Sequence, residues 1–169
     1  MTKDDYLLEY TDIENGSIQN LMDQIDQING KALNELRVQD LSYHRGEPIW
    51  PGQGVYIFRK GKRVLYVGKV SSMSFTERIA KHFDFRSFAW MNTLLKLISK
   101  KELNHETQDH DNLKIASKYA FENLNLVLIN FQTRNRINRI ERLLRSCTKP
   151  LNRFKNLTET NFEKIICEY

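Results

Sequence analysis

The chain has 169 residues, enough for one hydrophobic core but short for two domains, and its 26 Lys and Arg against 21 Asp and Glu give a net charge of +5. No run approaches the roughly 18 apolar residues that span a bilayer, and the first residues lack the apolar segment of a secretory signal. Cys147 and Cys167 have no CxxC partner, which argues against a zinc site or a disulfide framework. We therefore expect a cytoplasmic protein without a membrane partner, built as one α+β domain with extensions.

Charge is divided unevenly along the chain. Residues 1–50 carry four Lys and Arg against ten Asp and Glu, a net charge of −6, whereas residues 51–169 carry 22 against 11, a net charge of +11. A protein that binds a phosphate backbone requires a positive excess of this kind. The second region is therefore the candidate nucleic-acid-binding part, and the acidic first region is not expected to lie on DNA.

The acidic region, residues 1–50, is predicted to form a helical N-terminal extension. Ser17 can cap a helix that ends near Gly30 and whose apolar residues recur at helical spacing. These residues are Ile18, Leu21, Met22, Ile25 and Ile28. A second helical pattern follows in Leu33, Leu36 and Leu41. We expect the two helices to brace the core, with an arm that contacts a second copy of the chain as the alternative.

A β-hairpin is predicted next. Residues 54–58 and 64–68 are β-branched and aromatic runs on either side of a basic, glycine-containing turn, residues 59–63. Successive side chains of a strand point to opposite faces, so Tyr56 and Tyr66 can stand near each other on neighbouring strands.

A short helix is predicted directly after the hairpin. Thr76 can cap it, and Arg78 and His82 share one of its edges because they are four residues apart. Its inward-facing residues are Phe75, Ile79 and Phe83. A cation and a titratable ring therefore flank the end of the hairpin.

The middle of the chain is predicted to hold two more helices and a third strand. Residues 88–98 and residues 112–123 have helical patterns, separated by a polar loop at residues 100–111. Residues 124–129 are the best candidate for the third strand.

A helix that carries Glu141 follows the third strand. Thr133 or Asn135 opens it, and Glu141 falls at the border of its apolar face. The apolar face consists of Ile137, Ile140, Leu143 and Leu144. Arginines occupy much of the remainder, either as a solvated face or as contacts to phosphates. They are Arg134, Arg136, Arg139, Arg142 and Arg145, and the first four are our candidate DNA-binding residues.

Several of these segments, taken in order, resemble the GIY-YIG endonuclease family. The matching positions are residues 54–56 (Gly-Val-Tyr), residues 66–68 (Tyr-Val-Gly), Lys69, Arg78, Glu141 and residues 149–152 (Lys-Pro-Leu-Asn). Glu141 looks like the metal-binding glutamate of the family, and Pro150 with Asn152 looks like its terminal Pro-x-Asn. No single segment is diagnostic, and the resemblance depends on their shared order.

The resemblance implies a fold and a set of ligands. The fold is a small antiparallel or mixed three-stranded central sheet flanked by helices over residues 51–157, with a helical insertion at about residues 84–120. A capping-box pattern at Thr160 and Glu163 predicts a separate C-terminal helix over residues 158–169. The ligands are double-stranded DNA and one Mg²⁺ or Mn²⁺ ion per active site, held by Glu141, and a homodimer is possible, at least on DNA.

Phosphodiester hydrolysis needs a base for the attacking water and positive charge at the phosphoryl oxygens. Tyr56 is our choice of base, provided that nearby positive charge from Lys69 and the metal lowers the pKa of its phenol. Arg78 would bind the scissile phosphate through its planar set of donors. Tyr66 would hold the water or a phosphate. His82 could share proton transfer with Tyr56, which leaves the choice of base between these two open.

Two further matching positions receive supporting roles. Lys69 fits an ordinary phosphate contact as well as it fits tuning of the tyrosine. Asn152 is expected to fix the turn after the glutamate helix, beside the site rather than in the chemistry.

The sequence leaves little room for a separate targeting module, so specificity would come from the insertion, the arginine helix and a second subunit. We therefore expect a Mg²⁺-dependent, sequence-specific endonuclease similar to the small type II restriction endonucleases of the family. One alternative is a repair, phage or recombination nuclease that recognises DNA structure. Another is a DNA-binding module that keeps the fold but does not cut.

Overall fold

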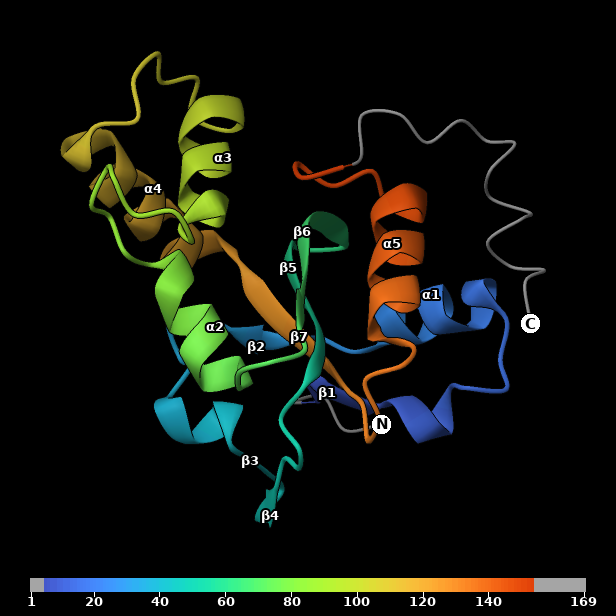
Figure 1. The fold of residues 1–169 in the computed structure, drawn as a ribbon. Coiled ribbons are helices and arrows are strands. Elements are labelled where there is room, and N and C mark those ends of the chain that lie inside the picture. The colour runs from blue at the N-terminus through green and yellow to red at the C-terminus, as the bar shows by residue number, and fades with distance from the viewer. Residues whose placement is uncertain (1–4, 154–169) are drawn as a thin grey trace.

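The computed structural model describes residues 5–153, which form an α+β structure (Figure 1). Its helices are α1 (Ile18–Gln27), α2 (Phe75–His82), α3 (Thr93–Lys101), α4 (His110–Asn123) and α5 (Ile137–Cys147), with short 3-10 turns η1 (Tyr10–Asp12) and η2 (Val38–Leu41). Its main strands are β1 (Leu7–Glu9), β2 (Lys31–Ala32), β5 (Gly54–Lys60), β6 (Arg63–Val70) and β7 (Asn125–Asn130), and β3 (Tyr43–His44) pairs with β4 (Glu47–Pro48) in a separate small hairpin. Within residues 5–153, no helix has the length and apolar character needed to cross a bilayer.

The predicted α+β class is confirmed, but the central sheet has five strands rather than the three that were expected. Strand order is β1-β7-β5-β6, and β2 also pairs with β7. The hairpin β5–β6 and the strand β7 form the antiparallel centre, while β1 runs parallel to β7 and makes the sheet mixed. The two additional strands come from the N-terminal region and satisfy backbone groups of β7 that would otherwise form an open edge.

The N-terminal region is therefore less helical than predicted. Its first helix is present as α1, capped by the hydroxyl of Ser17, which accepts a hydrogen bond from the Asn20 backbone N–H at 3.1 Å. The predicted second helix is absent among the described residues, because residues 31–32 form a strand, residues 33–35 form a turn, and the Leu33 N–H donates to the Leu124 carbonyl oxygen at 2.9 Å. Leu33 and Leu41 are nevertheless buried. Their apolar side chains therefore indicated burial correctly, although the residues between them do not form an α-helix.

Two other predicted helices differ in position or cannot be judged. The helix expected at residues 88–98 begins only at Thr93, because residues 84–92 form a loop. The helix expected at residues 158–169 lies outside the described residues.

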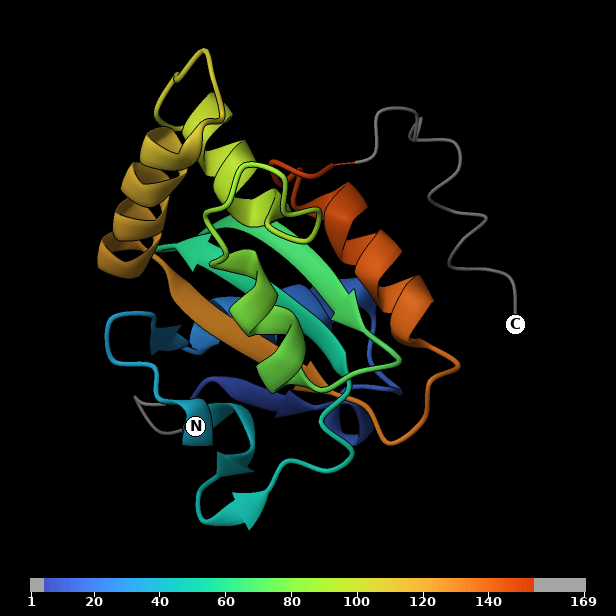
Figure 2. The same ribbon diagram turned by 60° about the vertical axis from the view of Figure 1, so that its left-hand side comes forward.

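Helices cover both faces of the sheet (Figure 2). On one face α2, α3 and α4 pack over the aromatic residues of the hairpin, and on the other α1 and α5 pack over its aliphatic residues. The alternation of β5 explains the division, because Tyr56 and Phe58 point to the first face and Val55 and Ile57 to the second.

The edge strand β6 is covered by the chain that follows α5. The Leu151 N–H donates to the Leu65 carbonyl oxygen at 2.8 Å. The side-chain amide of Asn152 accepts from the Val67 N–H at 3.2 Å and donates to the Val67 carbonyl oxygen at 2.6 Å. This amide occupies the place that a neighbouring strand would take, and it ties the end of α5 to the hairpin.

Gly54 and Gly61 provide a matched test of the hairpin. Gly54 has φ 148°, and a Cβ there would overlap the Ile129 carbonyl oxygen of β7, whereas Gly61 has φ 57° in the β5–β6 turn with open space around it. We expect Gly54→Ala to lower the free energy of unfolding by about 3 kcal/mol or more, through strain and overlap. Gly61→Ala should cost only about 1 kcal/mol, for the left-handed backbone. Urea unfolding of both variants checks the order, and equal losses would contradict the close approach of β5 and β7 at Gly54.

Candidate active site

Three of the predicted site residues meet at the hydroxyl of Tyr56. This side chain projects from the centre of β5 beneath α2, where it is fully buried. Its oxygen lies 2.6 Å from His82 Nε2, and Arg78 Nε donates to it at 3.1 Å. Arg78 and His82 lie four residues apart on α2, so one face of this helix supplies both contacts.

The position of α2 depends on its N-terminal cap. The cap is Ser74, whose hydroxyl accepts a hydrogen bond from the Glu77 N–H at 3.2 Å, and not Thr76 as predicted. Phe75 and Ile79 are buried in the core and fix the rotation of the helix. The predicted inward-facing residues and the shared edge are therefore present, although the helix starts earlier than its expected cap.

The contacts of the His82 ring define its tautomer. The Leu94 N–H, in the first turn of α3, approaches His82 Nδ1 at 3.5 Å, which leaves the ring proton on Nε2. Nε2–H and Arg78 Nε–H are then both donors to the Tyr56 oxygen. Two donors at this oxygen would stabilise a phenolate.

Burial dominates the ionisation of this cluster. It raises the pKa of the Tyr56 phenol, and the charge of Arg78 opposes that rise. Burial, and after it the charge of the neighbouring Arg78, lowers the pKa of His82 to about 3. At neutral pH the cluster therefore holds a neutral phenol, a neutral imidazole and one cation.

One N–H group of Arg78 is unsatisfied among the described residues. Its Nη1 is buried and has no hydrogen-bond partner within residues 5–153. An unsatisfied buried donor is costly, and a guanidinium N–H binds phosphate oxygens well. In the described part of the chain, Arg78 therefore holds one unsatisfied guanidinium donor, while its Nε is bonded to the Tyr56 hydroxyl.

Tyr66 and Gly68 of β6 complete this side of the site. The ring of Tyr66 stacks on that of Tyr56 with centroids 6.2 Å apart and planes inclined by 16°, and it meets the His82 ring edge-on at 5.0 Å. Gly68 lies directly opposite Tyr56 in the ladder, where a Cβ would overlap the phenol ring. Glycine is therefore required at this position for Tyr56 to lie flat against β6.

Glu141 lies next to this cluster, across Tyr66. Its side chain is buried on α5, and Arg145 Nη1 donates to its Oε1 at 2.9 Å. Burial raises the pKa of Tyr66, the charges of Arg78 and Arg145 oppose this rise, and the charge of Glu141 adds to it. Arg145 also donates through Nε to the Asn152 carbonyl oxygen at 2.8 Å. The Asn152 amide in turn bonds β6, so Glu141 is held against the edge of the hairpin.

The structure does not bring Lys69 to Tyr56. Lys69 pairs with Val55 and therefore points to the opposite face of the sheet, where its Nζ donates to Asn138 Oδ1 at 2.6 Å. The positive charge in contact with the phenol comes from Arg78 instead.

The four candidate DNA-binding arginines lie at the start of α5 and along it. Arg134 Nε donates to Gln53 Oε1 at 3.1 Å, and Arg136 Nη1 donates to the Tyr10 hydroxyl at 3.1 Å, but both side chains remain exposed. Arg142 is exposed and Arg139 is partly buried. Arg145 is different, because it forms an ion pair with Glu141. The two residues are four positions apart on a helix, and this spacing could have predicted the ion pair from the sequence.

The donor set fits a divalent cation that is only partly bound by protein. Within residues 5–153, no group of three or more His, Cys, Asp or Glu side chains could hold a metal ion. Mg²⁺ commonly binds through one or two carboxylates together with water and substrate phosphates. Arg145 Nη1 bonds Oε1 of Glu141, and Glu141 supplies the carboxylate that such a site requires. Glu141 can therefore hold Mg²⁺ or Mn²⁺ together with a bound phosphate.

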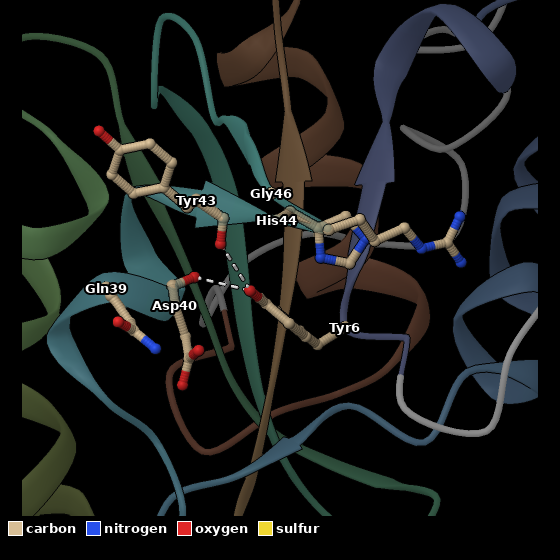
Figure 3. A pocket seen from close by; sticks show the side chains of 7 residues that line it. Tyr6, Gln39, Asp40, Tyr43, His44 and Gly46 are labelled. Carbon is tan, nitrogen blue, oxygen red and sulfur yellow. Dashed lines mark hydrogen bonds between the residues drawn. The ribbon is translucent and has the colours of Figure 1, made fainter.

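A hollow of about 440 Å³ is lined by none of these residues and lies within the N-terminal region, between Tyr6, the turn η2 and the β3–β4 hairpin (Figure 3). The Tyr6 hydroxyl lies 3.0 Å from the carbonyl oxygens of both Asp40 and Tyr43 there. Asp5 pairs with His44 at 3.1 Å and with Arg45 at 2.8 Å, so the charges at this place compensate one another. None of the predicted site residues lines this hollow.

Comparisons of this chain with protein-family models, with curated proteins and with solved structures find no match. Function is therefore inferred from the motifs and from the geometry of the site.

The neutrality of His82 has a measurable effect on stability. The folded protein holds the pKa of this ring at about 3, below its ordinary value of 6.5, so protonation favours the unfolded chain and stability is lost as pH falls below about 6.5. Between pH 6.5 and 5 the wild-type protein should lose about 2 kcal/mol more than His82→Gln, which cannot titrate but keeps an N–H donor. Urea unfolding at the two pH values gives the difference. Equal losses would show that His82 is not held neutral.

Proposed function

We propose that this protein is a Mg²⁺-dependent endonuclease that hydrolyses phosphodiester bonds of double-stranded DNA and belongs to the GIY-YIG type. The observation that carries the proposal is the contact of Tyr56 with Arg78 and His82, with the unused Arg78 donor beside the phenol and Glu141 beyond Tyr66. Strands β5, β6 and β7 with α2 and α5 would form the catalytic unit, and α3 and α4 the insertion.

Arg78 would bind the scissile phosphate. Its Nε is committed to Tyr56, which fixes the plane of the guanidinium, and its buried Nη1 faces no acceptor among the described residues. A phosphate oxygen that bonds Nη1 satisfies this donor and lies beside the Tyr56 oxygen. The fixed positive charge then stabilises the extra charge that the phosphoryl oxygens carry in the transition state.

Tyr56 would take the proton from the attacking water, and His82 would position it. The His82 ring is neutral and presents Nε2–H to the phenol oxygen, so at this atom it is a donor and not a base. With Arg78 it supplies two hydrogen bonds that favour the phenolate of Tyr56 once the phenol has lost its proton. This arrangement favours Tyr56 over His82 as the base.

Glu141 would hold the metal ion, and Arg145 would hold Glu141. When bound, Mg²⁺ supplies positive charge that stabilises the phosphoryl and leaving oxygens. Arg145 fixes the carboxylate through Oε1 and is itself anchored on the Asn152 carbonyl oxygen, so it would position Glu141 without adding a second carboxylate. A single carboxylate suits a one-metal site.

The proposed preference for double-stranded DNA is supported by the exposed arginines around α5. Exposed Arg134, Arg136 and Arg142 provide cationic contacts around α5, in a region whose net charge is +11. We propose that the protein is a sequence-specific type II restriction endonuclease that acts as a dimer on DNA. Preference for branched or damaged duplexes would identify a structure-specific nuclease instead, and binding without cleavage a DNA-binding module.

Cleavage of plasmid DNA tests this function. Wild-type protein with Mg²⁺ should give discrete fragments whose ends share one short motif, and EDTA should stop the reaction. Glu141→Gln should cut at least about 100-fold more slowly, because the amide binds Mg²⁺ poorly. Glu106→Gln, which changes an exposed carboxylate outside the site, is the matched control and should cut normally.

The outcomes separate the parts of the proposal. Nicking at many positions without a shared motif would contradict the sequence specificity, but the protein would still be a nuclease. Full activity of Glu141→Gln would show that the metal is held elsewhere. No cleavage of intact or branched DNA under any condition would reject the nuclease.

The pH dependence of cleavage distinguishes Tyr56 from His82. Burial raises the pKa of Tyr56, so the phenolate is the minor form at neutral pH and increases with pH. We therefore expect the single-turnover rate to rise close to tenfold per pH unit between about pH 6 and 8. A base at His82, whose pKa is about 3, would already be neutral throughout this range and would give a flat profile. Tyr56→Phe should lose both the rate and its slope.

A further inference from the structure

The loop that joins α2 to α3, residues 84–92, exposes large aromatic side chains. Phe88 is 79% exposed and Trp90 is 82% exposed, and Phe85 at the start of the loop is 40% exposed. The loop stands on the sheet face that α2 and α3 cover (Figure 2). Several large rings exposed within a few residues mark a binding surface. We call residues 84–92 the aromatic loop.

The aromatic loop is held in shape by polar contacts and not by its own rings. The side-chain amide of Asn92 is buried and donates to the carbonyl oxygens of Asp84 at 2.7 Å and Arg86 at 3.1 Å. Lys96 Nζ donates to the Ala89 carbonyl oxygen at 2.7 Å. The backbone is thus ordered before any partner arrives, which lowers the entropic cost of binding through Phe88 and Trp90.

The base of the aromatic loop is part of the candidate active site. Asp84 follows His82 by two residues, and the Leu94 N–H just beyond the loop contacts the His82 ring. The loop therefore leaves and re-enters the fold at the ring that bonds Tyr56. Arg78 lies on the helix from which this loop departs, four residues before His82.

The chemistry of the loop suits nucleobases better than phosphates. Its two charged residues, Asp84 and Arg86, neutralise each other through an ion pair. The guanidinium of Arg86 also lies 5.4 Å from the centre of the Phe88 ring, which fixes that ring from one side and leaves the other open. Aromatic rings bind bases by stacking, while the cationic region around them attracts the backbone.

We propose that the aromatic loop contacts the bases of the duplex beside the scissile phosphate, with Phe88 and Trp90 stacking on bases that are opened at that point. The inference rests on the proposed function and adds to it how the substrate is engaged. Apolar side chains that insert between base steps kink the duplex, and the larger protein surface that the bent DNA then covers offsets the cost of unstacking. The loop would thus distort the DNA and hold the phosphate at Arg78.

Trp90 provides a direct readout, because Trp50 is the other tryptophan of the chain. In a Glu141→Gln, Trp50→Phe parent, which binds without cutting, we would titrate a short duplex that wild type cuts, or a mixed-sequence duplex if none is cut. Trp90 fluorescence should be quenched and shielded from iodide. Added Phe88→Ala or Trp90→Ala should weaken binding by about 5- to 100-fold each, measured by the anisotropy of a dye-labelled duplex because the Trp90→Ala protein has no tryptophan. Ile115→Ala, which removes a half-exposed side chain on α4, should bind like the parent.

The other outcomes overturn the inference in distinguishable ways. If the parent binds DNA and both loop variants bind equally well, the aromatic loop has no role with bases and the nuclease proposal stands. If the parent does not bind DNA at all, the proposed function fails as well. If light scattering shows a DNA-free dimer that Phe88→Ala and Trp90→Ala dissociate, the rings serve a second copy of the chain instead. Circular dichroism of each variant excludes misfolding as the cause.

Discussion

The hydroxyl of Tyr56 is the interaction on which the arrangement of this protein depends. A fully buried phenol oxygen must find partners, and here they come from Arg78 and His82 on one helix, while the Tyr66 ring stacks on the phenol from the neighbouring strand. These contacts set the distance and rotation of α2 over the hairpin. Gly68 allows them, because a side chain in its place would push the ring away from β6. Packing and chemistry therefore impose the same geometry on the centre of the sheet.

The other constraint is closure of the sheet edges. Strand β7 would be open without β1 and β2, and β6 would be open without the amide of Asn152. The acidic N-terminal region is thus part of the sheet rather than an appendage. The segment after α5 has a double task, since it covers β6 and anchors Arg145 beside Glu141. Asn152 therefore takes part both in closing the sheet edge and in holding the residues of the candidate site.

The sequence was sufficient for features with a regular period and insufficient for short or distant ones. Alternation in the hairpin predicted the proximity of Tyr56 and Tyr66, and helical spacing predicted the common edge of Arg78 and His82. For Lys69, the predicted tuning of Tyr56 was wrong, because the same alternation puts Lys69, three residues after Tyr66, on the opposite face, and the phosphate contact stays a prediction. Strands β1 and β2 are too short to show a period. The role of Arg145 needed the fold, because its anchor is the carbonyl oxygen of Asn152.

The amide bonds between Asn152 and Val67 join positions that are 85 residues apart in the chain. During synthesis the hairpin, α2 and the Tyr56 cluster can form from residues that have already left the ribosome, since their contacts are comparatively local. Glu141 acquires its support only after residue 152 has emerged and docked on β6. The Tyr56 cluster and the support of the Glu141 carboxylate are therefore completed at different times, with the carboxylate last. A chain that is cut short before residue 152 keeps most of the sheet but lacks the contacts that hold Arg145 and Glu141 against β6.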